Sequence, residues 1–155
     1  MQKVTGTATA DTEGDGLTVV DDISDALGVW LDVARPVEVA QQRIESALSD
    51  RHGLCLTALE IMECLSRQRG WTPMSVVCTT VWRSQPRISR LVTQMEDREL
   101  VDRTKASDDK RAFQIKLTRK GRRTFQVASE TLSETLTLIA AQQDDLGAAL
   151  RQRLK

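Results

Sequence analysis

The chain has 155 residues, of which 40% are hydrophobic and 28% charged, and its formal net charge is zero. These values fit one globular domain. No apolar run approaches the ~18 residues of a membrane-spanning helix, and the polar, acidic start lacks the apolar core of a secretory signal. We therefore expect a cytoplasmic protein with no membrane partner.

The charge is unevenly distributed along the chain. Residues 1–50 contain 10 acidic and three basic side chains, whereas residues 83–123 contain 13 basic and six acidic ones. The remaining residues are close to neutral. A basic segment inside a neutral protein is typical of a module that binds a polyanion. The alternative is a solvated basic face without a ligand.

The N-terminal part predicts a disordered segment followed by a helix. Residues 1–17 are small, polar and acidic, and we expect them to be disordered. From Ile23 to about Leu48, apolar residues recur at helical spacing. Pro36 is expected to kink or split this helix near Ala34, and Gly53 to end the region.

Two shorter helices are predicted next. Thr57 is expected to start the first of them, with Glu60 three residues later completing a capping box. The turn at residues 70–73 ends it. In residues 74–82, MSVVCTTVW, the β-branched residues favour a strand in isolation, but the surrounding helices favour a short helix.

A helix, a hairpin and a long helix complete the chain. Ser84 is a natural N-cap and Pro86 fits the first turn of a helix that runs to about Glu99. Alternating apolar residues predict strands in residues 101–106 and 113–117, joined by a tip of more than two residues. Thr118 is expected to cap the long helix that follows, with a break near Asp144 and a short helix, LGAALRQRL, at the end of the sequence.

This order predicts a mainly α protein with a winged helix-turn-helix, an α+β fold suited to DNA. The helix from Ser84 would present its first turn to the major groove, and the basic hairpin would enter the minor groove. Solvated helix arginines and ordinary turn polarity are the alternatives. The predicted DNA-binding residues are Ser84, Gln85, Pro86, Arg87 and Arg90 on the helix, and Lys105, Asp109, Lys110 and Arg111 on the wing.

Three stretches carry a resemblance to a known family: LTALEIMECL, SQPRISRLVTQMEDRELVDR and SDDKRAFQIKLTRKG. They resemble the MarR family of bacterial transcription regulators, most strongly over residues 56–121. The wing is the specific part. Asp109, Arg111 and Ala112 match the family's Asp-x-Arg-Ala pattern, and the residues that match its Leu-Thr-x-x-Gly pattern are Leu117, Thr118 and Gly121.

The resemblance implies a homodimer that binds a pseudo-palindromic operator. It implies dimerisation helices in residues 18–53 and 121–155, a DNA-binding lobe in residues 54–120 and a wing in residues 101–117. It implies that Arg111 enters the minor groove. Such proteins usually repress genes and are released by a small aromatic effector. Candidate residues for its pocket are Trp30, Ala34, Val37, Met62 and Phe125, for which core or dimer packing is the alternative.

The chain departs from the family pattern at two turns. Trp82 and Arg83 stand where the family usually has glycine before the recognition helix, and Glu99 stands where it has glycine after that helix. A residue other than glycine at position 99 must accept a left-handed backbone or an altered turn. Trp82 packs between helices or lies near DNA, and both alternatives remain open.

Other chemistries have little support. The only histidine is His52, and the three cysteines, Cys55, Cys64 and Cys78, form no metal-binding spacing. We expect buried thiols, with a redox sensor as the sharper alternative. No nucleophile–base pair and no glycine-rich phosphate loop is visible, so we expect no catalytic residues, no metal and no cofactor. The rival functions are a protein-interaction scaffold that has lost operator binding and, more remotely, an enzyme.

Overall fold

The computed structural model describes residues 23–106, 112–142 and 145–153. The chain divides into two compact units, Met1–Ala34 and Arg35–Lys155, and the arrangement described below is that of the second unit. Three predictions lie outside the described residues: disorder in residues 1–17, the hairpin tip at residues 107–111, and the break near Asp144.

Helix α1 is a single helix, Ile23–His52, with Pro36 inside it. Of the two predicted alternatives, the split near Ala34 was wrong, because a proline removes one backbone hydrogen bond while its neighbours keep theirs. The kink at Pro36 stays a prediction. The boundary between the two units nevertheless falls at Ala34. The helix ends at His52, and Gly53 follows it with a φ of 61°, as the stop signal predicted.

Helix α2, Leu56–Ser66, begins without the predicted capping box. Cys55 occupies the N-cap and makes no side-chain capping bond, and Thr57 is buried within the first turn. The backbone N–H of Leu56 instead donates to Oε2 of Glu45 on α1, at 3.0 Å. The capping prediction was wrong because a carboxylate from another helix supplies the acceptor that a local side chain usually provides.

The next two helices form the predicted helix-turn-helix. Residues 74–82 do form a short helix, α3 (Met74–Val81), as their context indicated. Helix α4, Gln85–Asp97, follows Ser84 at the N-cap and carries Pro86 in its first turn, both as predicted. The side chain of Ser84, however, makes no capping hydrogen bond. Ile88, Val92 and Met95 form the buried face of α4.

The sheet has three antiparallel strands in the order β1-β3-β2. The predicted hairpin is present as β2, Val101–Lys105, and β3, Phe113–Leu117, in a register that pairs Val101 with Leu117 and Lys105 with Phe113. Strand β1 was not predicted. It contains only Thr72–Pro73, which is too short to show an alternating pattern, and it pairs with Gln114 and Ile115 of β3.

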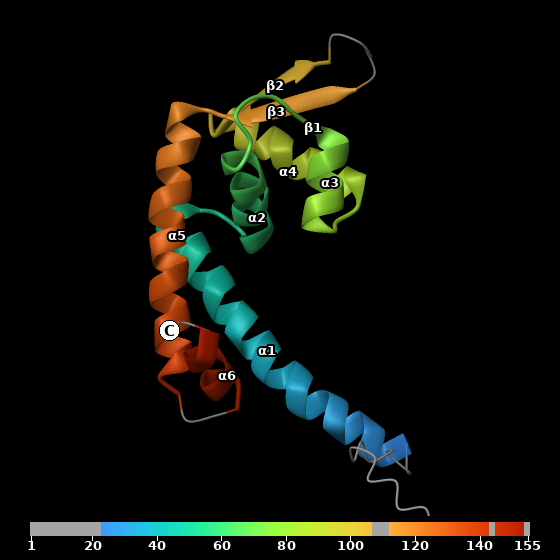
Figure 1. Cartoon of the computed structure of the whole chain (residues 1–155), viewed down its shortest axis with the longest axis vertical. Helices are drawn as coiled ribbons and strands as arrows, with labels where there is room; N and C mark the ends of the chain where they lie inside the picture. The colour runs from blue at the N-terminus through green and yellow to red at the C-terminus, as the bar shows by residue number, and fades with distance from the viewer. Residues whose placement is uncertain (1–22, 107–111, 143–144, 154–155) are drawn as a thin grey trace, which may run out of the picture. The chain divides into compact units, whose positions relative to one another are not determined.

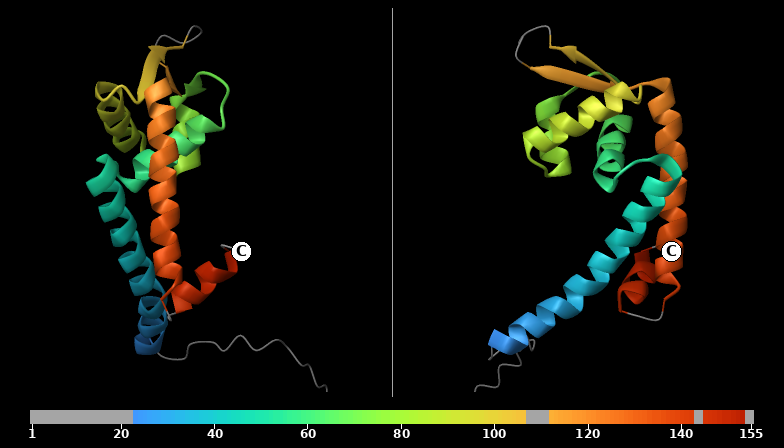
Figure 2. Two further views of the ribbon diagram at one scale, coloured as in Figure 1. Left: turned by 90° about the vertical axis from the view of Figure 1, so that its left-hand side faces the viewer. Right: turned by 180° about the vertical axis from the view of Figure 1, so that it is seen from behind.

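Two C-terminal helices complete the chain, α5 (Arg119–Ala140) and α6 (Asp145–Arg153). Thr118 caps α5 as predicted, because its Oγ1 accepts a hydrogen bond from the N–H of Gly121 at 2.8 Å. Figures 1 and 2 show the sheet beside the first turns of α5 and α6 beside its last turns. No helix in the described part of the chain is long and apolar enough to cross a membrane.

One hydrophobic core joins these elements. Its largest fully buried side chains come from α1, α2, α4, the sheet and α5, and include Leu48, Ile61, Met62, Ile88, Met95, Leu100, Ile115, Leu117 and Ile139. The elements packed around this core, with the hairpin projecting beyond them, form a winged helix, so the predicted fold class is confirmed.

Candidate nucleic-acid interface

The first turns of α4 bring five of the predicted DNA-binding residues together. Ser84, Gln85, Pro86, Arg87 and Arg90 are all exposed. Because the buried residues Ile88, Val92 and Met95 recur every three to four positions, the side of α4 that carries Arg90 faces solvent, and Arg87 flanks the buried stripe. The local sequence therefore creates an exposed basic face on a firmly anchored helix.

The arginines on this face are not neutralised. Arg90 donates from Nε to the carbonyl of Pro86 at 3.4 Å, and neither Arg87 nor Arg90 forms an ion pair with a described residue. Two backbone positions in this turn have no N–H group free for DNA, because Pro86 lacks an N–H and the N–H of Arg87 donates to the carbonyl of Ser84 at 3.0 Å. The exposed side chains of the turn are therefore candidates for contact with DNA.

The two turns that flank α4 adopt the left-handed backbone that the family's glycines suggested. Trp82 has a φ of 54° and Glu99 a φ of 59°. Trp82 is 85% exposed, so its side chain does not pack between the helices, and its proximity to DNA stays a prediction. Glu99 is held by its neighbours, since its carbonyl accepts from Oγ1 of Thr118 at 2.7 Å and its carboxylate pairs with Lys120 at 3.0 Å.

The wing is described only in part. Lys105 is exposed at the end of β2, where the predictions place a DNA contact. Asp109, Lys110 and Arg111 lie outside the described residues, so their roles stay predictions. Lys116 on β3 is engaged within the protein, because it pairs with Asp102 at 3.5 Å and stacks over the ring of Trp71 at 4.4 Å.

Sequence reasoning missed one basic residue of the wing, Arg103. Its guanidinium lies over the ring of Phe113, 3.9 Å from the centroid, in a groove between the hairpin and the helices α3 and α4. The signal was available in the alternating pattern, which puts Arg103 on the same face of the hairpin as the buried Val101.

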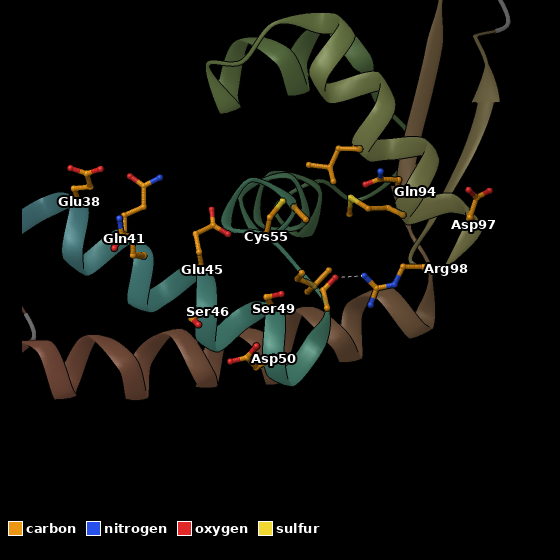
Figure 3. A pocket seen from close by; sticks show the side chains of 16 residues that line it. Glu38, Gln41, Glu45, Ser46, Ser49, Asp50, Cys55, Gln94, Asp97 and Arg98 are labelled. Carbon is orange, nitrogen blue, oxygen red and sulfur yellow. Dashed lines mark hydrogen bonds between the residues drawn. The ribbon is translucent and has the colours of Figure 1, made fainter.

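A second hollow lies on the other side of the helix-turn-helix, between the C-terminal half of α1, the start of α2, and α4 (Figure 3). Its volume is about 1080 Å³. We call it the α1–α4 cavity. Its wall combines apolar surface with many polar side chains, and those labelled in Figure 3 include Glu38, Gln41, Glu45, Ser49, Gln94, Asp97 and Arg98.

The five predicted effector-pocket residues do not line the α1–α4 cavity. Met62 is completely buried in the core, and Phe125 packs against that core from α5. Val37 is exposed, and Trp30 and Ala34 belong to the other compact unit. The sequence missed the cavity because its polar residues come from two helices that are distant in the chain, α1 and α4.

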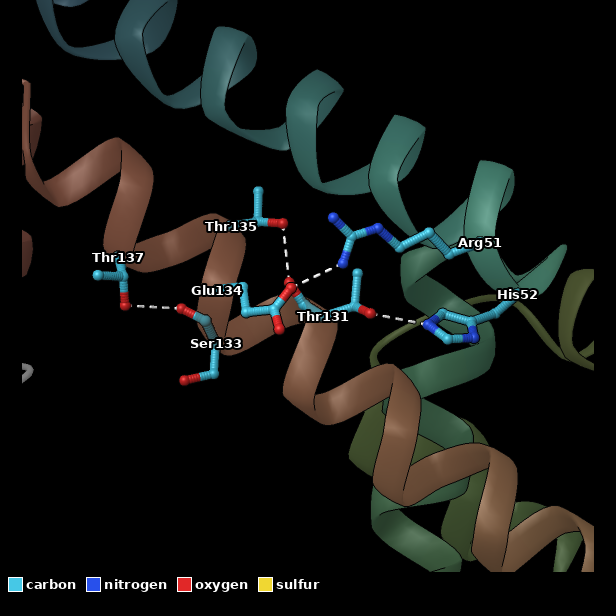
Figure 4. Close-up of polar contacts among 7 residues, drawn as sticks. All are labelled: Arg51, His52, Thr131, Ser133, Glu134, Thr135 and Thr137. Carbon is cyan, nitrogen blue, oxygen red and sulfur yellow. Dashed lines mark hydrogen bonds and ion pairs between the residues drawn. The ribbon is translucent and has the colours of Figure 1, made fainter.

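The end of α1 is tied to α5 by two side-chain contacts (Figure 4). Nε2 of His52 lies 2.8 Å from Oγ1 of Thr131, and Arg51 pairs with Glu134 at 2.7 Å. The only histidine thus has a structural partner, and the described residues contain no cluster of three or more metal-ligating side chains.

Comparison with known proteins gives a result for the fold alone. No family model and no curated protein matches the chain. Solved structures do match: a MarR family regulator of Streptomyces coelicolor in complex with DNA has 16% identity and a TM-score of 0.72, covering 93% of this chain and 89% of that one.

Two further structures come from rhodococci. A MarR family regulator of Rhodococcus sp. RHA1 has 23% identity and a TM-score of 0.68, with 86% of this chain and 93% of that chain covered. CouR of Rhodococcus jostii RHA1, bound to p-coumaroyl-CoA, has 24% identity and a TM-score of 0.64, with coverages of 86% and 92%. The fold resemblance expected from the wing pattern is therefore confirmed.

Proposed function

We propose that this chain, which has the fold of the MarR family transcriptional regulators, is itself a regulator that binds double-stranded DNA. The observation that carries the proposal is the exposed, unpaired pair Arg87 and Arg90 on the first turns of α4, next to a basic hairpin. The same fold is found in complex with DNA in the S. coelicolor regulator. No catalytic role is proposed, and such a regulator would act in the cytoplasm.

In this proposal, α4 reads the major groove and the wing enters the minor groove. Arg87 is well placed to bind a guanine edge, because a guanidinium can donate two hydrogen bonds to it. In the wing, Arg111 would enter the narrow minor groove, whose negative potential attracts arginine, and Asp109 and Lys110 are the neighbouring wing residues predicted to contact DNA. Lys105 and the exposed Arg119, Arg122 and Arg123 supply affinity that does not depend on sequence.

The active form is proposed to be a homodimer on a pseudo-palindromic operator. Support comes from apolar side chains that a monomer leaves exposed to water, which are more often found where proteins associate. On α1 these are Leu27, Val29, Trp30, Val33, Val37 and Val39, and on α5 they are Val127 and Leu138. They lie in the two regions, residues 18–53 and 121–155, for which dimerisation was predicted.

A small effector is proposed to release the regulator from its operator, so that it acts as a repressor. The α1–α4 cavity contacts both a proposed dimerisation helix and the DNA-reading helix, so a ligand there could shift one against the other. The CouR structure shows a related fold holding an aromatic thioester ligand. The predicted pocket of Trp30, Ala34, Val37, Met62 and Phe125 is the second candidate for the effector site.

The experiment is a fluorescence-anisotropy titration of duplex DNA from upstream of the protein's own gene, with a scrambled duplex of equal length, at two salt concentrations. We expect salt-sensitive binding with a preference for the native duplex. If neither duplex binds, selection from random sequences follows. Failure of that selection to enrich any site would favour the rival function, a winged-helix scaffold for other proteins.

A further inference from the structure

The register of the wing places a cation on the face that covers the core. Arg103 pairs with Ile115, and the neighbouring pair on the same face is Val101 with Leu117. All three of those apolar partners are at most 2% exposed. Arginine is costly on such a face unless its charged end finds a partner. The side chain therefore has a role that the alternating pattern of the hairpin does not explain.

Among the described residues, Arg103 has no such partner. Its Nε is buried, and no acceptor binds it. The flat guanidinium rests on Phe113, 3.9 Å from the ring centroid. No ion pair joins Arg103 to the described acidic residues. Stacking covers one face of the guanidinium and leaves its edge as a planar fork of N–H donors, which suits the oxygens of a phosphate.

The groove in front of Arg103 is built for an anion. We call it the wing groove; its volume is about 380 Å³. Its described lining includes Ser75, Ser89 and Gln85, whose side chains can donate hydrogen bonds, and contains no acidic residue. Residues from two helices that can donate hydrogen bonds thus line the same groove as Arg103.

The position of the wing groove between α4 and the hairpin indicates that the anion is a phosphate of the DNA backbone. One wall is α4, which we propose lies in the major groove, and the other is the hairpin, which we propose enters the adjacent minor groove. A major and a minor groove are separated by one sugar–phosphate strand. That strand must pass between the two elements that flank it, and side-chain contacts to phosphate fix the register of a protein on DNA.

We propose that Arg103, held flat by Phe113, binds a backbone phosphate in the wing groove and so sets the docking of α4 and the wing together. The inference rests on the proposed DNA-binding function. Gln85 and Ser89 would complete the contact from α4, and Ser75 from α3.

The test compares four variants with the unaltered protein in the anisotropy assay, over a series of salt concentrations. Arg103→Met should lower affinity about tenfold for native and scrambled duplexes alike, since charge-assisted bonds are lost without loss of base contacts. It should also reduce the slope of log affinity against log salt by about one per protomer. Arg103→Lys should keep the slope but bind more weakly, and Phe113→Leu should do the same.

The matched control is Arg51→Met, which removes one positive charge at the end of α1, where Arg51 pairs with Glu134. It should leave both the affinity and the salt slope unchanged. If Arg103 has only a structural role, Arg103→Met should lower thermal stability without changing the slope of log affinity against log salt. An unchanged slope in a folded Arg103→Met protein would therefore overturn the proposal.

A direct readout covers the case in which Arg103→Met does not fold. In ¹⁵N-labelled unaltered protein, the Nε–H resonance of Arg103, assigned by its loss in Arg103→Lys, should move on addition of duplex DNA. A resonance that stays in place on bound protein would contradict the proposal. If no duplex binds at all, the proposed regulator function is contradicted, whatever the role of Arg103. Inorganic phosphate then decides whether the anion site exists: movement of the resonance supports it, and none overturns it.

Discussion

Arg98 donates a hydrogen bond from Nη1 to the carbonyl oxygen of Gly53, at 2.6 Å, and so joins the end of α4 to the end of α1. Its Nη2 donates to the carbonyl of His52 at 2.7 Å. These carbonyls are among the unsatisfied acceptors at a helix C-terminus, where a cation is also favoured by the helix dipole. The guanidinium also lines the α1–α4 cavity (Figure 3), so an anionic effector would compete for the same donors.

Replacing Arg98 with alanine should lower the free energy of unfolding by about 1–2 kcal/mol, because two charge-assisted hydrogen bonds to exposed carbonyls are lost. Urea denaturation followed by circular dichroism measures the change. Arg67→Ala is the control, since Arg67 pairs only with Glu63 on the surface of α2 and should change stability by less than about 1 kcal/mol. Equal effects of the two substitutions would show that the link between α4 and α1 contributes nothing specific.

Glu45 should matter through the start of α2. Its carboxylate accepts from the N–H of Leu56 at 3.0 Å, in place of a local capping residue. Glu45→Ala should destabilise the protein by about 0.5–2 kcal/mol, as the loss of an N-cap does. Glu45→Gln should cost less, because its amide oxygen still accepts the bond. Hydrogen exchange of the Leu56 amide locates the effect, and unaltered exchange there in Glu45→Ala would refute it.

Gly121 should tolerate no side chain. A Cβ at this position would lie 1.9 Å from the carbonyl oxygen of Leu100 and 2.9 Å from its carbon, both of which are backbone atoms. Gly121→Ala should therefore destabilise the fold by about 3 kcal/mol or more. At Gly70 a Cβ meets nothing within 4 Å, so Gly70→Ala serves as the control. Thermal unfolding of both variants makes the comparison, and similar melting temperatures would contradict the close packing of α5 on the turn before β2.

Cys78 should react slowly with alkylating reagents at neutral pH. Burial raises the pKa of its thiol, which a weaker backbone hydrogen bond partly offsets. A raised pKa keeps the thiol protonated at pH 7, and its reactivity should appear only as the pH rises towards that pKa. Iodoacetamide labelling followed by mass spectrometry across pH measures this, with Cys78→Ser to identify the signal. Faster labelling of Cys78 than of an unstructured peptide thiol at pH 7 would be the contrary result.

The same thiol lies in the wall of the wing groove. Bound duplex DNA should therefore protect Cys78 from alkylation, while Cys64, buried in α2, should show no change in its labelling. Labelling at high pH, with and without duplex, tests this prediction. Equal labelling of Cys78 in both samples, with the duplex shown to be bound, would place the DNA away from the wing groove.

The sequence by itself determined the elements whose causes are local. The apolar spacing on α4, Pro86 in its first turn, the alternation in residues 113–117 and the cap at Thr118 all act within a few residues, and each is present as predicted. The family pattern of the wing then indicated the fold. Glu99 has the left-handed backbone that was one of its two predicted alternatives, and its contacts with Thr118 and Lys120 hold it there.

Tertiary structure decided what depends on residues far apart in the chain. Strand β1 exists because β3 offers Thr72–Pro73 an edge to pair with, and α2 is capped by a carboxylate eleven residues away on another helix. The bonds from Arg98 to the end of α1 and the buried Nε of Arg103, which no described acceptor binds, have no counterpart in any local pattern. Hydrogen-bond partners of this kind are chosen by packing, which brings together groups that the sequence keeps apart.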